Sequence, residues 1–221
     1  MMRFALVTGA SRGIGRAVAE KLQEDGFIVL TPSRSEMDLA VPASIEAYVA
    51  GLTESVDVIV NNAGINIIAE TAHVRDDVLE ETFQINLLGP IRLVRGLLPG
   101  MISNGYGRIV NISSIWSLVA KPGRSVYAGT KSGLNGLTRA MAVELAPHGI
   151  LVNAVAPGYV ATELTRQNNS LAELEKIRAA IPLGRLAEAN EIAELVAFLC
   201  SKKNSYITGQ VIYADGGFTC Q

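Results

Sequence analysis

The stretch Thr8-Gly9-Ala10-Ser11-Arg12-Gly13-Ile14-Gly15 decides the fold, because its glycines lie between a strand pattern and a helix pattern. Residues 3–8 predict a buried strand, and residues 15–25 carry apolar side chains at helical spacing. Glycines let the backbone approach phosphates, and the free N–H groups and dipole of a helix N-terminus favour an anion. The spacing Gly-x3-Gly-x-Gly departs from the commoner Gly-x-Gly-x2-Gly. In this context a diphosphate site is a better interpretation than a simple glycine turn.

Strand and helix patterns alternate through the rest of the chain. Strands are predicted over residues 27–31, 56–60, 108–114, 150–155 and 211–214, and helices over 45–52, 76–101, 127–146 and 188–200. Residues 163–180 are more polar and less patterned, so they are open to interpretation as a mobile lid or as a helical hairpin. The alternation predicts a single α/β domain over residues 1–221, a Rossmann-type doubly wound parallel sheet with helices on both faces.

Composition excludes several classes of function. Of 221 residues, 49% are hydrophobic and 18% charged, which indicates a well-buried globular protein. The net charge of −2 provides no basic field for nucleic acid or an anionic membrane. No uncharged apolar run is long enough to predict a membrane span. Cys200 and Cys220 lack metal-site or redox spacing, so we expect no metal and a reducing, cytoplasmic compartment.

The end of the second predicted strand bears on cofactor choice. Many NAD-binding folds place an acid there to hold the ribose 2′-hydroxyl. Here Ser33 and Arg34 occupy the region, and Arg12 lies in the glycine loop. Guanidiniums and a hydroxyl suit a 2′-phosphate, which favours NADP(H) over NAD(H), although Glu36 lies close by. Only three residues separate Arg34 from Asp38, so there is no room here for a crossover helix.

A second cluster of polar residues extends from Ser114 to Lys131. The strand pattern over residues 108–114 delivers Ser114 to its end, and a helix opening near Tyr127 places Tyr127 and Lys131 on one face, about 5–6 Å apart at Cβ. An ammonium at that distance favours phenolate by roughly 3 kcal/mol, or about 2 pKa units, from a normal value near ~10. Alone, Tyr-x3-Lys is a weak signal, and ordinary surface and core residues are then the better interpretation.

Two asparagine positions add to this constellation. Asn61-Asn62-Ala63-Gly64 ends the strand over residues 56–60, where ligands bind in open α/β sheets, although the same residues also suit a plain turn. Asn86 lies within the long helical pattern over residues 76–101, where asparagine is unfavourable, so a structural or catalytic role is expected. Pro90 predicts a kink nearby.

In their joint order and spacing these motifs resemble the short-chain dehydrogenase/reductase family over essentially the whole chain. The pattern is most similar to the 3-oxoacyl-[acyl-carrier-protein] reductase branch. The residues that carry the resemblance are the glycine stretch, Asn61 to Gly64, Asn86, Ser114, Tyr127, Lys131, Pro157-Gly158 with Thr162, Pro182 to Arg185, Thr208 to Gln210, and Asp215 to Gly217.

The resemblance implies a role for each site residue. Ser114 would hydrogen-bond the substrate oxygen, Tyr127 would donate a proton to it, and Asn86 would anchor a water joined to Lys131. Lys131 would bind the nicotinamide ribose and lower the pKa of Tyr127. Asp38 and Leu39 would flank the adenine, while Val160 and Thr162 would meet the carboxamide. The implied cofactor site comprises Gly9, Ser11, Arg12, Gly13, Ile14, Gly15, Ser33, Arg34, Asp38, Leu39, Asn62, Ala63, Gly64, Tyr127, Lys131, Pro157, Gly158, Val160 and Thr162.

The function that follows is NADPH-dependent reduction of a carbonyl to a hydroxyl, with a 3-oxoacyl thioester or similar ketone as substrate. An NAD-dependent alcohol or sugar dehydrogenase remains the alternative within the family. A nucleotide-binding regulator without turnover is the alternative outside enzymes. We expect a homotetramer, with a dimer next, because the helices around Asn86 and Tyr127 carry Leu87, Leu93, Leu97, Leu137, Met141 and Leu145.

Overall fold

The computed structural model describes residues 2–163, 165 and 169–221. Its centre is a parallel sheet whose strands follow the order β2-β1-β3-β4-β5-β6. These strands are β1 (Phe4–Val7), β2 (Ile28–Leu30), β3 (Val58–Asn61), β4 (Gly107–Ile112), β5 (Ile150–Pro157) and β6 (Val211–Ala214). The predicted α/β class and parallel sheet are confirmed.

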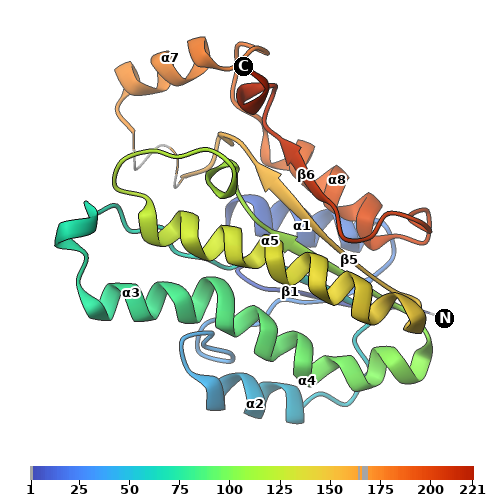
Figure 1. The fold of residues 1–221 in the computed structure, drawn as a ribbon. Helices are drawn as coiled ribbons and strands as arrows, with labels where there is room; N and C mark the ends of the chain where they lie inside the picture. Colours follow the sequence, from blue (N-terminus) through green and yellow to red (C-terminus); the bar gives the residue numbers. More distant parts are fainter. Residues whose placement is uncertain (1, 164, 166–168) are drawn as a thin grey trace.

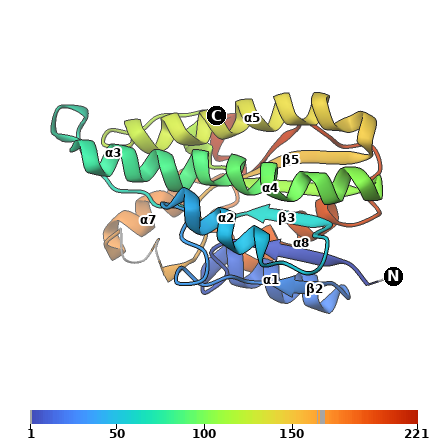
Figure 2. The same cartoon turned by 90° about the horizontal axis from the view of Figure 1, so that it is seen from below.

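Helices cover both faces of this sheet (Figures 1 and 2). One face packs against α1 (Gly13–Glu24) and α8 (Ala189–Cys200), and the other against α2 (Pro42–Ala50), α4 (Gly89–Asn104) and α5 (Ser125–Leu145). Successive strand residues point to opposite faces, so Ala5 and Val7 belong to the first hydrophobic cluster while Leu6 belongs to the second. Because both faces are covered, the central strands are mostly apolar, and their few polar residues, among them Asn111 and Asn153, are buried as well.

The chain reverses its direction of winding between β1 and β3. From β1 it passes to β2 at the sheet edge, and then returns across β1 to β3 on the other side. In the described stretch 31–41 the chain forms a short turn at Ser33 to Glu36 and no helix, so α2 follows directly. The predicted absence of a helix after Arg34 is confirmed, and β2 is left as an edge strand.

The long helical pattern after residue 75 is interrupted once. It comprises α3 (Asp76–Phe83), a π-helical turn (Gln84–Leu88) and α4, and the turn lies directly before Pro90, where a kink was predicted. Residues Asp76–Asn104 are long and apolar enough to cross a membrane by length and composition. Leu93 and Met101 are nevertheless fully buried against the sheet, so this segment is built as a core helix of the fold.

The remaining segments connect these elements. Short 3₁₀ helices occur at Thr71–His73, Ile115–Ser117, Ala146–His148 and Phe218–Cys220. Within residues 163–180, Leu171–Ala180 forms α7, whose N-terminus is capped by Ser170 and Glu173. Residues 164 and 166–168 lie outside the described residues, so the interpretation as a mobile lid stays a prediction.

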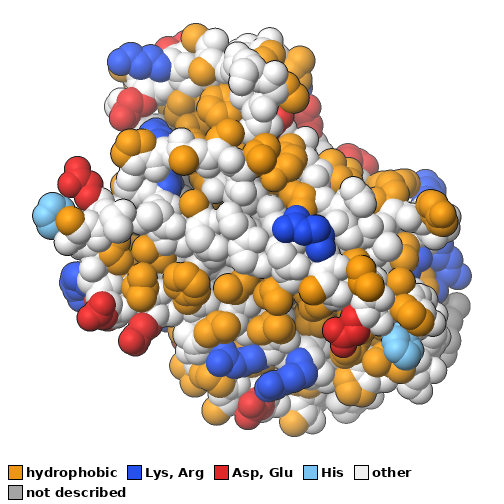
Figure 3. Space-filling view, viewed as in Figure 1, with side chains coloured by type: hydrophobic (Ala, Val, Ile, Leu, Met, Phe, Trp, Pro, Cys, Tyr) orange, Lys and Arg blue, Asp and Glu red, His pale blue; other side chains and the backbone are white. Residues whose placement is uncertain are grey.

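Part of the apolar surface expected on the outer helices lies in the core. Leu93, Leu97 and Leu145 are 0%, 8% and 2% exposed, so placing them on an outer face was wrong. They belong to the inward stripe of α4 and α5, because a continuous core requires large side chains against Ile109 and Ile150. Hydrophobic side chains still spread over the outer face of α4 and α5, interrupted by a few basic ones (Figure 3). The exposed ones are Leu88, Ile91, Ile102 and Val143.

Candidate active site

The glycine loop is clamped to the end of β3. Thr8 Oγ1 accepts hydrogen bonds from the N–H groups of Asn62 and Ala63 at 3.0 Å each. Asn62 Nδ2 donates to the carbonyls of Thr8 and Gly9 at 2.9 and 3.1 Å. A Cβ on Gly15 would lie 2.3 Å from Asn62 Nδ2 and 2.3 Å from the Gly9 carbonyl oxygen, so only glycine fits there. The loop and the N-terminus of α1 are thereby fixed at the switch point between β1 and β3, where ligands bind in open α/β sheets.

A cavity of about 760 Å³ extends from this loop across the carboxyl ends of the strands. Its wall combines the glycine loop, the turn after β2, the end of β3, the N-terminal part of α5 and the segment after β5. Every residue predicted from the sequence to bind the cofactor lines it: Gly9, Ser11, Arg12, Gly13, Ile14, Gly15, Ser33, Arg34, Asp38, Leu39, Asn62, Ala63, Gly64, Tyr127, Lys131, Pro157, Gly158, Val160 and Thr162. The glycine cradle and the cavity therefore fit a dinucleotide.

Lys131 is a buried cation at the centre of the cavity wall. Its side chain is 3% exposed, and Nζ donates a 2.7 Å hydrogen bond to the carbonyl of Ile112 at the end of β4. Burial lowers its pKa from the usual value to about 8, because a low-dielectric environment disfavours the charged form. Near neutral pH the ammonium is thus still mostly protonated, but close to its point of deprotonation.

Ser114 and Tyr127 approach from two elements, as the sequence predicts. Ser114 caps the 3₁₀ helix that follows β4 and accepts a 3.2 Å hydrogen bond from the Trp116 N–H. Tyr127 lies in the first turn of α5, with its ring centroid 5.6 Å from Lys131 Nζ. Burial raises the pKa of Tyr127, and this outweighs the lowering by its hydrogen bond with Ser114 and by the charge of Arg124. The expectation that the pKa is lowered was therefore wrong for the protein alone.

Asn86 lies in the π-helical turn and does not line the cavity directly. Its Oδ1 accepts from the Ile65 N–H at 2.9 Å, and its Nδ2 donates to the Ile65 carbonyl at 2.8 Å and to Thr130 Oγ1 at 3.2 Å. The extra residue in the turn aims Asn86 at the segment after Gly64. Asn86 thus joins the end of β3 to α5 beside Lys131.

The turn after β2 carries its own carboxylates. The Glu36 side chain accepts hydrogen bonds from the Ser33 N–H and hydroxyl at 2.8 and 2.7 Å. Arg34 donates from Nε to Asp38 at 3.0 Å and lies 3.7 Å from Glu81. Arg34 and Ser33 do line the cavity, but both already have anionic partners. A 2′-phosphate would therefore compete with carboxylates here, which the sequence alone did not show.

Two further contributors were not assigned a role in the site from the sequence. Thr8 holds the turn after β3, and its position as the last residue before the first glycine is the signal that could have identified it. Asn111 in β4 accepts from Asn61 at 2.8 Å and donates to Thr138 at 2.8 Å, tying β3, β4 and α5 together beneath the cavity. A buried asparagine within an apolar strand is the corresponding signal.

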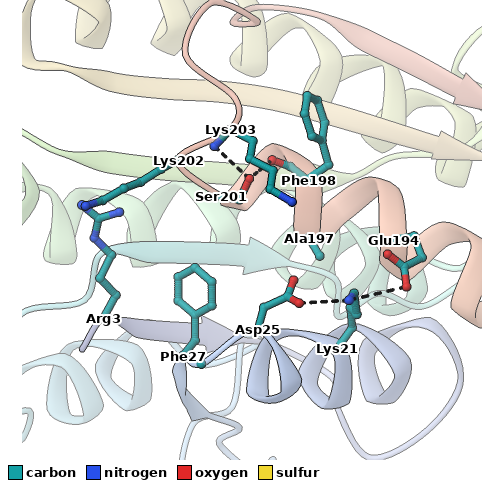
Figure 4. Close-up of a pocket in the computed structure, with 11 residues that line it drawn as sticks. Arg3, Lys21, Asp25, Phe27, Glu194, Ala197, Phe198, Ser201, Lys202 and Lys203 are labelled. Carbon is teal, nitrogen blue, oxygen red and sulfur yellow. Dashed lines mark hydrogen bonds and ion pairs between the residues drawn. The ribbon is translucent and has the colours of Figure 1, made fainter. Parts of the chain in front are cut away.

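A second cavity, of about 460 Å³, lies at the amino ends of the strands between α1 and α8 (Figure 4). Arg3, Phe27 and Phe198 line it, and Lys21 there is held by Asp25 at 2.9 Å and Glu194 at 3.6 Å. No residue of the predicted site reaches this cavity. Among the described residues, no group of three or more His, Cys, Asp or Glu side chains is arranged to hold a metal ion.

Together, the glycine cradle, the switch-point cavity and the Ser–Tyr–Lys set are features of a dinucleotide-binding α/β oxidoreductase. The family model described as enoyl-(acyl carrier protein) reductase matches residues 31–219, and the one described as short chain dehydrogenase matches residues 3–50. A 3-oxoacyl-[acyl-carrier-protein] reductase of Aquifex aeolicus is 39% identical over 97% of this chain and 96% of its own length.

Solved structures of similar proteins point to the same family. A gluconate 5-dehydrogenase from Burkholderia cenocepacia, in complex with NADP and tartrate, matches with a TM-score of 0.94 at 31% identity, covering 99% of this chain and 96% of that one. A putative NAD(P)-dependent gluconate 5-dehydrogenase from Beutenbergia cavernae, with bound NADP at low occupancy, matches with a TM-score of 0.92 at 35% identity. The match covers 99% of this chain and 97% of that one. The chain belongs to the short-chain dehydrogenase/reductase family and is an NAD(P)-dependent oxidoreductase acting on a small molecule.

Proposed function

We propose that this protein reduces a ketone to an alcohol with NADPH, using Tyr127 as the proton donor. The observation that carries the proposal is that Ser114, Tyr127 and Lys131 line the same cavity as the glycine cradle. A carbonyl held between Ser114 and Tyr127 would therefore lie within reach of a nicotinamide bound along the cavity. The proposed catalytic residues are Asn86, Ser114, Tyr127 and Lys131, within a single cofactor-binding domain over residues 1–221.

The cofactor supplies the hydride when it is bound. Its diphosphate would be held by the N–H groups of the glycine loop and by the N-terminus of α1. Lys131 would donate to the ribose hydroxyls, Val160 and Thr162 would meet the carboxamide, and Asp38 and Leu39 would flank the adenine. Arg12, Ser33 and Arg34 support the binding of NADPH over NADH. Arg34 would leave its ion pair with Asp38 and pair with the 2′-phosphate of NADPH instead.

The electrostatics of the protein suit the reductive direction. Because burial raises its pKa, Tyr127 is protonated at neutral pH and can act as an acid. Ser114 would hydrogen-bond the carbonyl oxygen as negative charge develops there. Lys131, with its pKa of about 8, can exchange a proton near neutral pH, and Asn86 would anchor the water that connects it to solvent.

Two substrate classes are supported by the relatives. The curated relatives named as 3-oxoacyl-[acyl-carrier-protein] reductases support a 3-oxoacyl thioester or similar ketone. The gluconate dehydrogenases support the alternative, oxidation of an alcohol or sugar acid with NAD(P). Trp116 and Tyr159 line the cavity in edge-to-face contact at 6.0 Å, and Phe218 packs against Tyr159 at 5.7 Å. This aromatic wall of Trp116 and Tyr159 supports a partly apolar substrate. A regulator that binds nucleotide without turnover is the remaining alternative.

Assembly and location are also proposals. The exposed apolar side chains of α4 and α5 support a homotetramer, with a dimer as the next choice. Cys200 is buried and Cys220 exposed, both as free thiols, which supports a reducing, cytoplasmic compartment.

The test is a screen of NADPH oxidation against 3-oxoacyl thioesters, sugars and sugar acids, steroids and quinones, with each reverse reaction run on the alcohol and NADP⁺ or NAD⁺. We expect turnover with at least one ketone class and NADPH. Tight cofactor binding without turnover in either direction on any class would favour the regulator instead.

A further inference from the structure

Arg124 is a buried cation on the substrate side of the cavity. It is the residue directly before α5, three positions before Tyr127, and its side chain lines the cavity with Trp116 and Tyr159. Only 8% of it is exposed. Its charge acts on both neighbouring phenols, because it lowers the pKa of Tyr127 and of Tyr159 against the larger effect of burial. Arg124, Tyr127 and Tyr159 all line this part of the cavity.

The backbone of Arg124 is fixed on both sides. The preceding Gly123 has φ of +76°, and its carbonyl accepts a 3.2 Å hydrogen bond from the Ala69 N–H. The Arg124 carbonyl accepts a 2.8 Å bond from the Ala128 N–H in the first turn of α5. The side chain thus projects from a rigid corner between the loop and the helix.

The guanidinium lacks the anionic partner that a buried charge normally has. Among the residues that the structure describes, no carboxylate forms an ion pair with it and no side chain or carbonyl accepts a hydrogen bond from it. Within this described part of the chain it contacts the face of Trp116, with the guanidinium carbon 5.8 Å from the ring centroid. By contrast, the buried Arg108 donates from its two terminal nitrogens to the carbonyls of Gly107, Gly149 and Asn204, and within the described residues only its Nε lacks a partner. The nitrogens of Arg124 are not among the fully buried polar atoms that lack a partner, so they face the open space of the cavity, where an anion from outside the chain can pair with them.

We infer that Arg124 binds the carboxylate of an oxo acid or hydroxy acid substrate whose carbonyl or carbinol carbon lies at Ser114 and Tyr127. This rests on the proposed function, since it names the substrate class of that site. A guanidinium presents a planar fork that matches a carboxylate with two parallel hydrogen bonds. Trp116 and Tyr159, which line the cavity beside Arg124, would contact the carbon chain of the substrate.

The same geometry would also allow Arg124 to act only on the acidity of Tyr127, and that role predicts different kinetics. If Arg124 only adjusted the acidity of Tyr127, its loss would slow charged and neutral ketones alike and shift the pH profile. If Arg124 binds a carboxylate, its loss should lower kcat/KM for the keto acid and leave kcat/KM for the matched ester nearly unchanged. The ratio of kcat/KM for acid and ester therefore separates the two roles.

The kinetic test uses pyruvate, acetoacetate and levulinate with their methyl esters, which keep the ketone and remove the charge. For the chain length that fits best, we expect Arg124→Gln to lower the acid-to-ester ratio of kcat/KM by about ten- to a hundredfold, the usual effect of one charge-assisted contact. Arg124→Lys should recover part of it. The matched control is Arg139→Gln, an exposed arginine on the same helix, which should change nothing.

A binding test does not depend on turnover. Trp116 is the only tryptophan of the chain and contacts Arg124, so its fluorescence reports on this site. With NADP⁺ saturating, titration with levulinate should change the emission of the native protein and of Arg139→Gln, but not of Arg124→Gln. NADP⁺ affinity and thermal stability should be equal in all three, which excludes misfolding.

Identical acid-to-ester ratios and identical titrations in native protein and Arg124→Gln would overturn the inference. If the native protein turns over none of the ketones, the proposed reduction fails for this panel. The fluorescence titration alone then decides whether Arg124 binds a carboxylate. An Arg124-dependent fluorescence change would then still support the carboxylate site, and its absence would refute it.

Discussion

Lys131 combines a charge with nearly complete burial, and this determines how the protein responds to pH. Its pKa is about 8 in the folded protein and near ~10.4 in the unfolded chain. Above pH 8 the folded state releases a proton that the unfolded state keeps, so this group makes the protein more stable as pH rises through 8. Below pH 8 both states are protonated and the full cost of the buried charge remains.

We therefore predict that the free energy of unfolding rises by about 1 kcal/mol between pH 7 and pH 9 in the native protein because of Lys131. Lys131→Met should lack this rise. Urea unfolding between pH 7 and pH 9 measures the free energy of unfolding of both proteins. Subtracting one pH profile from the other removes the contributions of all other titrating groups. Parallel pH profiles for the two proteins would show that Lys131 carries no such penalty.

At this scale the sequence predicted which residues meet but not their charge states. Tyr127, Ser114 and Lys131 converge as expected, because the end of β4 positions Ser114 and one face of α5 positions the other two. The pKa of Tyr127 depends on how much protein surrounds the phenol, and the partners of Arg34 depend on how residues 31–41 turn. Neither follows from spacing. Arg124 was missed because nothing in a sequence marks a single arginine as buried and unpaired.

At the scale of elements, the turn after β2 holds the groups that we expect to discriminate between NADPH and NADH. Glu36 holds the Ser33 N–H and hydroxyl, which are donors that a 2′-phosphate would use, and hydrogen bonds from Ser33 keep the pKa of Glu36 below its usual range. Its charge also repels a phosphate. The turn is thus less favourable to NADPH than Arg34 alone would suggest.

Glu36→Gln should bind NADPH about two- to fivefold more tightly and NADH almost unchanged, since an exposed charge interaction is worth up to ~1 kcal/mol. Arg34→Asp should weaken NADPH strongly and NADH comparatively little. Dissociation constants from nicotinamide fluorescence test both. If native protein binds NADH as tightly as NADPH, or if Glu36→Gln weakens NADPH, the interpretation of this turn fails.

The order of the elements was predictable, and their detail was not. Alternating patterns predicted the parallel sheet and the short path from Arg34 to Asp38. The π-helical turn at Gln84–Leu88 was not predicted, because it is imposed by the contacts of Asn86 with Ile65 and Thr130 rather than by local preference. The helix Leu171–Ala180 was ambiguous because its apolar residues form only a weak stripe.

At the scale of the whole molecule, the outer face of α4 and α5 is the surface that we expect to be buried between subunits. Val143, 81% exposed on α5, is the most exposed apolar side chain on it. Sedimentation should show a tetramer, or a dimer, for the native protein. Val143→Arg should shift the distribution toward the 23.5 kDa monomer.

Tyr206→Arg is the control for that variant, because Tyr206 is 95% exposed in the turn after α8, outside α4 and α5. It should leave the assembly unchanged. A native protein that sediments only at 23.5 kDa at micromolar concentration would contradict the proposed assembly.

The central claim is that Tyr127 donates the proton in an NADPH-dependent reduction, and Tyr127→Phe tests it most directly. The phenylalanine keeps the ring and removes the acid, so the single-turnover rate of NADPH oxidation, measured with the best ketone from the screen, should fall at least ~10²-fold. The dissociation constant for NADPH should stay within about twofold of the native value, since the ring still packs in the cavity wall. A Tyr127→Phe protein that oxidises NADPH at a near-native rate with that ketone would contradict the account.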